Sequence, residues 1–474
     1  MTLTAADWGA LAEAIAGEVV LPGDPGYDAA RRPAIARFDD VRPSAVVRGA
    51  TAADVAETVG LARAAGVPLA ARSGGHCFAG RSSTDGIVVD VSPMDAVSVG
   101  ADGVATIGAG ARLGAVYDAL DAHGLTIAAG CGPTVGIAGL VLGGGLGLLG
   151  RLHGLTSDQL LGAEVVLADG SEVECDTGRH EDLFWALRGA GAGGFGVVTS
   201  LRFATLPAPE ATRLHAVWPF AAAAALIGAW QEWAPDGPGA LAATLLVEAG
   251  DAPGDSPAVT LTGAHVGPEP EAAALVEELV ARAGAEPAEL LLDQAPYREV
   301  KRALAGLGAD DGLEDGHAFS RSELFAQALP EEAVAALVEH LGAGRAAGEG
   351  RQLDLTPMGG AYGRVAPDAT AFAHRGARFS LKHTVVVRPD AAAAERGAAR
   401  EWLERSFALA HPSGTGGVYP NFPEPELGDD AWPRAYHGAN FDRLVAVKAR
   451  YDPGDVFRGV QTIPAPARAA RPIG

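Results

Sequence analysis

The sequence predicts a protein of mixed helix and strand with two domains, and three observations lead to this. The chain has 474 residues, which is long for one domain when a domain spans roughly 100–200 residues. Before Pro207, short apolar runs alternate with segments of helical spacing, as in an α/β region. After Pro207, glycine thins out and long Ala/Leu/Glu stretches alternate with strand-like runs, which predicts a second domain of α+β type.

The elements of the first domain follow from local patterns. A helix is predicted where apolar residues recur at helical spacing behind Thr51, a good N-cap, and before Gly66. Short β-branched runs predict strands, the last of them ended by the Asp169-Gly170 turn. The predicted helices are Ala52–Ala65 and Leu113–Ala122, and the predicted strands are Val67–Ala71, Gly86–Val91, Val104–Ile107 and Glu164–Ala168.

The second domain is predicted from the same two periodicities. Its helices are Phe220–Trp233, Glu271–Ala285 and Glu331–Leu341, and its strands are Ala242–Glu248, Val259–Thr262 and Phe379–Val387. A glycine-rich, aromatic segment then returns at Gly414–Phe422, and a basic-flanked helix is predicted at Phe441–Arg450. The C-terminal segment is therefore similar in composition to the glycine-rich first domain.

Composition excludes several classes of protein. Hydrophobic residues make up 48% of the chain and charged residues 20%, which is typical of a soluble globular protein. The formal charge of -23 would repel nucleic acid and anionic membranes, so neither is expected as a partner. Cys77, Cys131 and Cys175 form no CxxC pair, and the N-terminus resembles neither a signal peptide nor a membrane span. We expect a cytoplasmic protein without a metal site.

Glycine-rich motifs are abundant but individually weak. The pattern GxGxxG occurs at 145–150, 189–194 and 191–196, and with 64 glycines it arises by chance roughly once in such a chain. The segment before Gly145 is broken by glycines rather than a clean strand, which disfavours a dinucleotide fold. A nicotinamide enzyme with Asp169 at the ribose remains an alternative. Neither HExxH nor GxSxG is present.

The string Ala71–Gly80 is more informative. A predicted strand runs into a loop that offers an arginine, consecutive backbone amides and a histidine. Arginine and a nest of N–H groups suit a pyrophosphate, and a neutral imidazole can form a covalent tether. An ordinary loop histidine is the alternative for His76.

This string resembles the R-S-G-G-H loop of FAD-linked oxidases of the berberine bridge enzyme and glucooligosaccharide oxidase type, within the vanillyl-alcohol oxidase superfamily. Further segments agree in order, among them Thr134–Gly147, Gly154–Asp158, Asp182–Gly189, Phe195–Thr199, Tyr419–Phe422, Tyr436–Asn440 and Tyr451–Pro453. The resemblance implies an α+β, PCMH-type FAD-binding fold. Residues 1–206 and 418–474 would form the FAD-binding domain, and residues 207–417 an inserted substrate domain with an antiparallel sheet covered by helices.

The resemblance also implies where the cofactor binds. FAD would be bonded through His76 to its 8α-methyl group. The single bond is preferred, because Cys131 lies one residue earlier than the cysteine of relatives, where Gly132 stands. A second, 6-S-cysteinyl bond through Cys131 is the alternative, because a loop can absorb a shift of one residue. The remaining cofactor residues would be Arg72, Ser73, Gly74, Gly75, Gly132, Thr134, Val135, Gly136, Gly139, Gly143, Gly144, Gly196, Val198, Tyr419 and Asn421.

For catalysis, the resemblance implies that Tyr419 accepts the proton of an alcohol, which requires a lowered phenol pKa. Lys382 would face the substrate and His383 would not, because side chains alternate along a strand. A small Val135 would leave room for O2, which favours an oxidase that makes H2O2. The substrate is a sugar or a secondary metabolite, and only 7 tyrosines favour the latter. A monomer or homodimer is expected, and a dehydrogenase with another acceptor or a non-catalytic binding protein remain alternatives.

Overall fold

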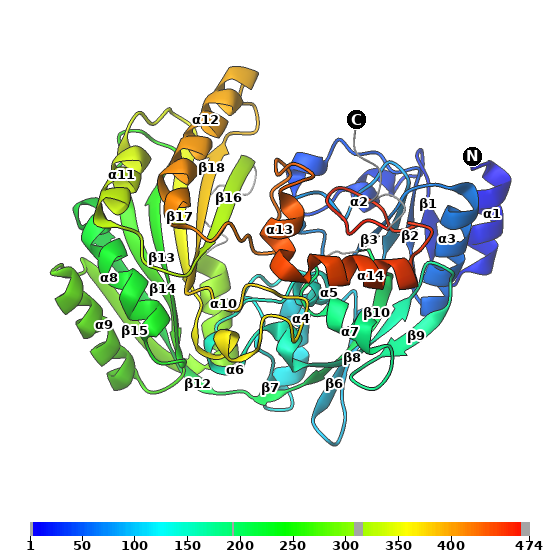
Figure 1. Cartoon of the computed structure of the whole chain (residues 1–474), viewed down its shortest axis with the longest axis horizontal. Coiled ribbons are helices and arrows are strands. Elements are labelled where there is room, and N and C mark those ends of the chain that lie inside the picture. The colour runs from blue at the N-terminus through cyan, green and yellow to red at the C-terminus, as the bar shows by residue number, and fades with distance from the viewer. Residues whose placement is uncertain (1–2, 192–193, 308–315, 466–474) are drawn as a thin grey trace.

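The computed structural model describes residues 3–191, 194–307 and 316–465, so Gly193 of two glycine motifs lies outside them. Two halves lie side by side (Figure 1). One half contains a seven-stranded sheet, and the other contains a four-stranded and a five-stranded sheet. Within the described part of the chain, no helix is long and apolar enough to cross a membrane.

In the half that contains the N-terminus, the first continuous segment of the chain extends from helix α1 to strand β11. Its helices are α1 (Ala5–Ala14), α2 (Tyr27–Arg31), α3 (Ala52–Ala65), α4 (Leu113–Asp121), α5 (Ile137–Leu142), α6 (Gly150–His153) and α7 (Glu181–Leu187). Its strands are β1 (Glu18–Val20), β2 (Ala45–Arg48), β3 (Leu69–Arg72), β4 (Ile87–Asp90), β5 (Val97–Val99), β6 (Val104–Gly108), β7 (Leu125–Thr126), β8 (Leu160–Val166), β9 (Glu172–Cys175), β10 (Val197–Ala204) and β11 (Leu206–Pro207).

Local signals account for most of these elements. Thr51 and Asp54 form a capping box at the start of α3, and Gly66 ends this helix in the left-handed conformation. Strand β8 ends two residues earlier than predicted. The reason is that the turn already starts at Leu167, whose N–H bonds to the Ser171 carbonyl.

The sheets of this half are small. In the four-stranded sheet β1-β2-β4-β3, the strands β2 and β3 both run parallel to β4, and β1 is antiparallel to β2. The five-stranded sheet β5-β6-β10-β8-β9 is antiparallel throughout. Helix α5, not a strand, precedes Gly145, and the following helix α6 has only four residues. This segment therefore lacks the strand–turn–helix of a nicotinamide-binding motif.

The other half is one antiparallel sheet in the order β15-β12-β14-β13-β17-β18-β16. Its strands are β12 (Glu210–Pro219), β13 (Leu241–Ala249), β14 (Ala258–His265), β15 (Glu289–Pro296), β16 (His317–Phe325), β17 (Glu349–Pro357) and β18 (Phe379–Val387). Helices α8 (Ala223–Asp236), α9 (Glu269–Ala283), α11 (Glu331–Gly342) and α12 (Ala393–Ala410) cover one face, and α10 (Tyr297–Leu307) lies on the side of the first half (Figure 1).

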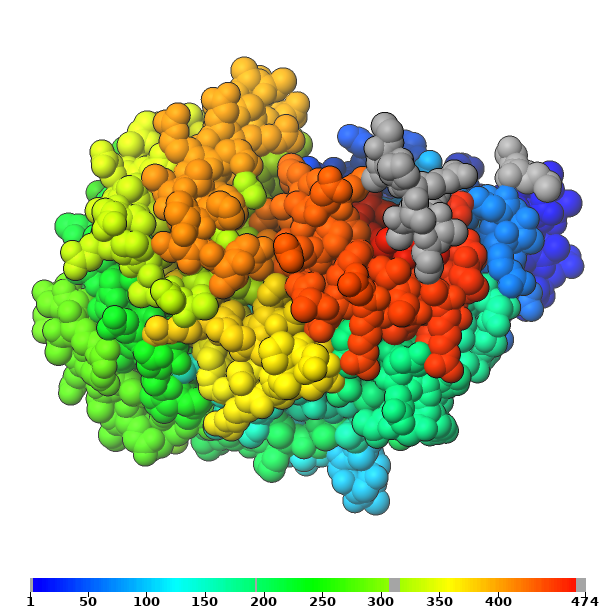
Figure 2. All heavy atoms as spheres, in the orientation of Figure 1, coloured from blue at the N-terminus to red at the C-terminus, as the bar shows by residue number. Residues whose placement is uncertain are grey.

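The C-terminal segment returns to the first half. Helices α13 (Trp432–His437) and α14 (Phe441–Tyr451), red in Figures 1 and 2, lie over the half that holds the N-terminus. One hydrophobic cluster joins side chains from Trp8 to Phe203 with others from Val418 to Ile463 and also includes Ala371, whereas a second extends from Leu214 to Ala410. Both clusters are consistent with the predicted domain boundaries at 206 and 417, which stay a prediction.

Two buried cations hold the halves together. The guanidinium of Arg151 on α6 donates to the carbonyls of Met358, Leu241, Pro235 and Gly237 at 2.7–2.9 Å. Lys301 on α10 donates to the carbonyls of Ala129 and Gly130 at 2.7 and 2.8 Å. Because both side chains satisfy carbonyls across the joint, they fix how the halves meet.

Candidate active site

The loop after β3 meets the loop before α5. The ring Nε2 of His76 lies 3.1 Å from Thr134 Oγ1, and Ser73 Oγ donates to the Ala109 carbonyl at 2.7 Å. A side chain at Gly74 would collide with the backbone of Gly136, and one at Gly136 with Ser73. Glycine at both positions therefore lets the two loops pack back to back, with His76 and Thr134 at their rim.

The Arg72 side chain, predicted to line the pyrophosphate, bonds to backbone carbonyls of the protein. It is 5% exposed, and its guanidinium donates to the carbonyls of Ser82, Ala30 and Arg31 at 2.7–3.0 Å. A guanidinium used in this way holds the first turn of the loop, and the prediction that Arg72 lines a pyrophosphate stays a prediction.

The surface beside these loops suits a large cofactor. Gly132, Thr134 and Gly139 are exposed, and a side chain at Gly139 would meet nothing within 4 Å. Among the described residues, the N–H groups of Gly74 and Gly75 have no hydrogen-bond partner. Backbone donors without a partner suit a pyrophosphate, and the exposed residues leave room for a large cofactor. The residues present therefore fit FAD.

At other predicted cofactor residues, the protein's own side chains fill the adjacent space. Gly143 and Gly144 are buried, and side chains there would meet Asn421 and Phe372. Val198 is 5% exposed and packs in the core. These three residues thus have packing contacts within the protein, and their role at the cofactor stays a prediction. Gly196 is half-buried, with Val165 beside it, and Val135 is half-buried.

Tyr419 lies at the centre of the loops from both ends of the chain. Its phenol oxygen accepts hydrogen bonds from the N–H groups of Gly145 and Leu146 at 3.0 and 3.1 Å, and from Asn421 Nδ2 at 3.0 Å. Positive φ angles at Gly144 and Gly145 turn these two N–H groups toward the oxygen. The same Asn421 Nδ2 donates to the Leu140 carbonyl at 2.8 Å.

The electrostatics at Tyr419 differ from the expectation. Three N–H donors favour a phenolate, yet burial outweighs them and raises the pKa of Tyr419 above its usual value of 10. The lowered phenol pKa that was expected from the sequence is therefore absent. Tyr419 is protonated at neutral pH, and within the described residues no acceptor faces its O–H.

Lys382 and His383 point to opposite faces of the sheet. Lys382 pairs with Asp354 at 3.1 Å, and its Nζ lies 5.2 Å from the centroid of the Phe422 ring. That ring lies 5.0 Å from the ring of Tyr419. His383 is fully buried on the other face, where its Nδ1 lies 2.8 Å from Ser406 Oγ, and burial lowers its pKa to about 3. Only Lys382 faces the tyrosine loop.

A row of polar side chains that was not predicted from the sequence continues from Lys382. Asp354 accepts from Thr356 Oγ1 at 2.9 Å, and Gln352 Nε2 donates to Glu248 Oε1 at 2.7 Å. We call this row the polar strip; its members, all half-buried, are Glu248, Gln352, Asp354, Thr356, Lys382 and Thr384. The spacing of two between Gln352, Asp354 and Thr356 is the signal that would have predicted it.

Cys131 lies between the two halves. It is a half-buried free thiol directly after Gly130, whose carbonyl accepts from Tyr117 Oη and from Lys301 Nζ, both at 2.8 Å. Burial lowers the pKa of Lys301 to about 8. The described residues contain no cluster of three or more His, Cys, Asp or Glu side chains that could hold a metal ion.

Comparisons with known proteins agree with this geometry. A family model described as FAD binding domain matches residues 43–176, and one described as berberine and berberine like matches residues 418–464. The FAD-linked oxidoreductase YgaK of Bacillus subtilis is 32% identical over 95% of this chain and 97% of its own length. Chitooligosaccharide oxidase of Gibberella zeae is 31% identical over 89% of this chain and 87% of its own length.

Solved structures extend the likeness to the whole fold. A glucooligosaccharide oxidase of Acremonium strictum superposes with a TM-score of 0.85 at 28% identity, covering 96% of this chain and 98% of that one. The predicted α+β fold of the PCMH type, with an antiparallel sheet covered by helices, is thereby confirmed. The chain belongs to the FAD-linked oxidoreductases of the berberine bridge enzyme type.

Proposed function

We propose that this protein is an oxidase that converts an alcohol to a carbonyl compound and passes the electrons to O2, giving H2O2. The observation that carries the proposal is that the His76 loop and the Tyr419 loop both contact the segment 134–146, His76 at Thr134 and Tyr419 at Gly145 and Leu146. The chemistry that FAD supplies when bound is hydride acceptance followed by reoxidation. O2 as the acceptor is supported by the small side chain of Val135.

His76 is the proposed anchor of the cofactor. It stands at the rim of the open surface, with its Nε2 against Thr134. A glucooligosaccharide oxidase of the same fold carries 6-S-cysteinyl, 8α-N1-histidyl FAD. By this likeness, the 8α-histidyl bond forms at His76. The single bond is preferred because Cys131 is displaced by one residue. A second bond at Cys131 remains the alternative.

Tyr419 is the proposed base. Its oxygen accepts hydrogen bonds from three N–H donors within a side chain that is 4% exposed, so its position is fixed by the loops around it. These donors stabilise the phenolate that takes up the hydroxyl proton. Lys382, with its charge partly offset by Asp354, lies behind Phe422 and stabilises negative charge that develops at the site.

The polar strip supports a sugar as the substrate class. Its carboxylates, amide and hydroxyls alternate donors with acceptors, as recognition of several neighbouring hydroxyl groups requires. The Oγ1 atom of Thr384 is buried without a partner in the described part of the chain, so it has unused hydrogen-bonding capacity. This favours a sugar over the secondary metabolite suggested by the low tyrosine content.

The first experiment is the visible spectrum of the purified protein, followed by acid precipitation. A yellow pellet is the expected result, and yellow supernatant would overturn the covalent bond but not the flavoenzyme. Next, anaerobic mixing with glucose, cellobiose or benzyl alcohol tests the substrate class through bleaching of the flavin band. Bleaching by benzyl alcohol alone would contradict a sugar substrate, and a colourless folded protein would contradict the proposed oxidase.

A further inference from the structure

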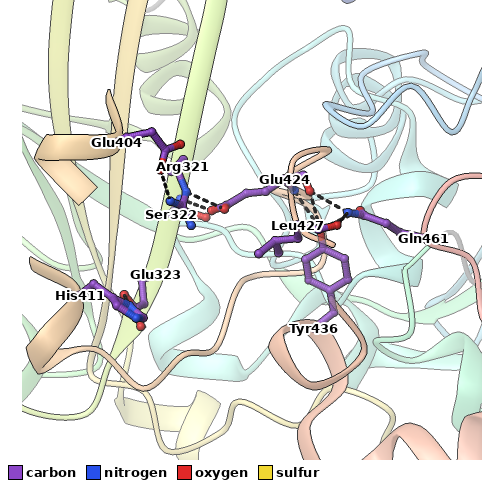
Figure 3. Close-up of polar contacts among 9 residues, drawn as sticks. All are labelled: Arg321, Ser322, Glu323, Glu404, His411, Glu424, Leu427, Tyr436 and Gln461. Atoms are coloured by element: carbon purple, nitrogen blue, oxygen red, sulfur yellow. Dashed lines mark hydrogen bonds and ion pairs between the residues drawn. The ribbon is translucent and has the colours of Figure 1, made fainter. Parts of the chain in front are cut away.

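The loop that carries Tyr419 is tied at both ends to one edge strand. Strand β16 is the last strand of the seven-stranded sheet, so its outer edge has backbone groups that no neighbouring strand pairs. The hydrogen bonds and ion pairs that hold the loop involve four consecutive residues of β16, Arg321 to Leu324. Figure 3 shows the side chains on both sides of this junction.

The first end of the loop is held by backbone and side-chain bonds. The N–H of Leu324 donates to the Gly417 carbonyl at 2.8 Å, and the N–H of Thr415 donates to the Leu324 carbonyl at 3.0 Å. The Glu323 carboxylate, 2% exposed, accepts from the Gly416 N–H at 2.7 Å and lies 2.9 Å from His411 Nδ1.

The second end is held by one buried carboxylate. Glu424 is 2% exposed, and its Oε1 accepts from the Ser322 N–H at 2.6 Å. Its Oε2 pairs with Arg321 Nε at 3.0 Å, while Arg321 Nη1 pairs with the exposed Glu404 at 2.7 Å. Both partners of Glu424 are donors, so a carboxylate satisfies them together and an amide cannot.

The main chain at Glu424 is fixed from its own side as well. Its N–H donates to Tyr436 Oη at 2.9 Å, and its carbonyl accepts from Gln461 Nε2 at 2.8 Å (Figure 3). Residue 424 is therefore a rigid link between the C-terminal segment and β16. Replacing the Glu424 side chain should therefore move the main chain at the end of the loop as well as the side chain.

The other edge of β16 pairs with the strand that carries Lys382. Ser322, which donates to Glu424, stands opposite Lys382 in the register of β16 and β18. The positions of the Tyr419 loop and of Lys382 are thus both set from the same residue of β16. On the basis of the proposed oxidase function, we infer that Glu424 is a positioning residue that fixes Tyr419 relative to Lys382 and to the substrate between them.

The charge at Glu424 supports this role. Burial raises the pKa of Glu424, while Arg321 opposes the rise and Glu404 adds to it. A buried carboxylate is costly to keep ionised, and replacing such pairs by apolar groups is often neutral for stability. A group of this kind is better explained by the geometry that its bonds impose than by a gain in stability.

The test compares Glu424→Gln with a matched control, Glu404→Gln. Both remove one carboxylate that pairs with Arg321, but only the first lies on the loop. Arg321→Lys is the second variant, because a single nitrogen cannot serve both carboxylates. Amide hydrogen exchange of residues 418–424, measured by mass spectrometry in purified protein, reports the loop directly and needs no substrate.

We expect faster exchange of this peptide in Glu424→Gln and Arg321→Lys than in the wild type and in Glu404→Gln. Equal exchange in all four proteins would overturn the inference. In anaerobic stopped-flow reduction by cellobiose, the limiting rate should fall at least about tenfold in the two loop variants, with the half-saturating concentration little changed, as for a displaced reacting group.

A change in half-saturation alone, or an equal loss of rate in Glu404→Gln, would also overturn the positioning role. The two proposals fail separately. If cellobiose does not reduce the wild-type flavin, the sugar substrate is wrong, and hydrogen exchange still decides whether Glu424 holds the loop. If exchange is unaffected while cellobiose reduces the wild type normally, the positioning role is wrong and the oxidase stands.

Discussion

The proposed role of Tyr419 predicts a steep pH dependence of flavin reduction. A base accepts a proton only in its deprotonated form, and burial raises the pKa of Tyr419 above its usual value of 10. Between pH 7 and 9 the phenolate is therefore a small fraction of the enzyme, and that fraction rises tenfold for each pH unit. The limiting rate of reduction should rise about 100-fold across this range.

Replacing the phenol tests the source of this slope. Tyr419→Phe should lower the limiting rate by a factor of about 10² to 10⁴, the usual contribution of a positioned base, and should flatten its pH dependence. The packing contacts with Phe372 and Phe422 are kept by phenylalanine. Bound flavin should therefore be retained, which the absorbance spectrum checks.

The matched control is Tyr362→Phe. Tyr362 is also a buried phenol beside the glycine segment, and its hydroxyl donates to the Gly147 carbonyl at 3.1 Å. Stopped-flow reduction at saturating substrate, in buffers from pH 7 to 9, should show the slope in this variant and in the wild type. A rate that is level from pH 7 to 9 in the wild type, or a slope that survives in Tyr419→Phe, would refute the assignment.

Three further predictions concern the cofactor and the fold. His76→Ala should retain flavin that acid precipitation releases into the supernatant; acid-stable flavin in the His76→Ala, Cys131→Ser double variant would show that both tethers are misassigned. Gly143→Ala should displace the amide of Asn421, which a new side chain would strike, and slow reduction at unchanged flavin content. Burial lowers the pKa of Lys301 to about 8 from the usual lysine value of 10.5, so stability should rise as pH increases from 8 to 10. That rise in melting temperature should be absent in Lys301→Met, and parallel curves for the two proteins would contradict it.

Local patterns in the sequence predicted many elements closely. The helix at Ala52–Ala65 was predicted at its observed bounds because Thr51 and Gly66 are capping signals that act over a few residues. Strands β15 and β16 and helix α12 were missed. In β15 nearly every residue is exposed on both faces, so no alternation marks the strand, and only pairing with β12 makes it one.

In the candidate site too, some features could be predicted from the sequence and others could not. The residue types at His76, Tyr419 and Asn421 were recognisable from sequence because each stands in a short motif. Their partners were not, because hydrogen-bond and ion-pair partners lie far apart in the chain: Tyr419 bonds to Gly145, and Lys382 pairs with Asp354 on a neighbouring strand.

By itself, the sequence determined the mixed fold, the family resemblance and the chemical groups available for flavin chemistry, because these depend on residue identity and local spacing. The tertiary structure alone decided how those groups are used. It turned the Arg72 guanidinium to backbone carbonyls, surrounded the Tyr419 oxygen with three donors while raising its pKa, and placed Glu424 against Arg321. The physical reason is that burial and long-range pairing set the protonation and orientation of a side chain, and neither is encoded within a short segment.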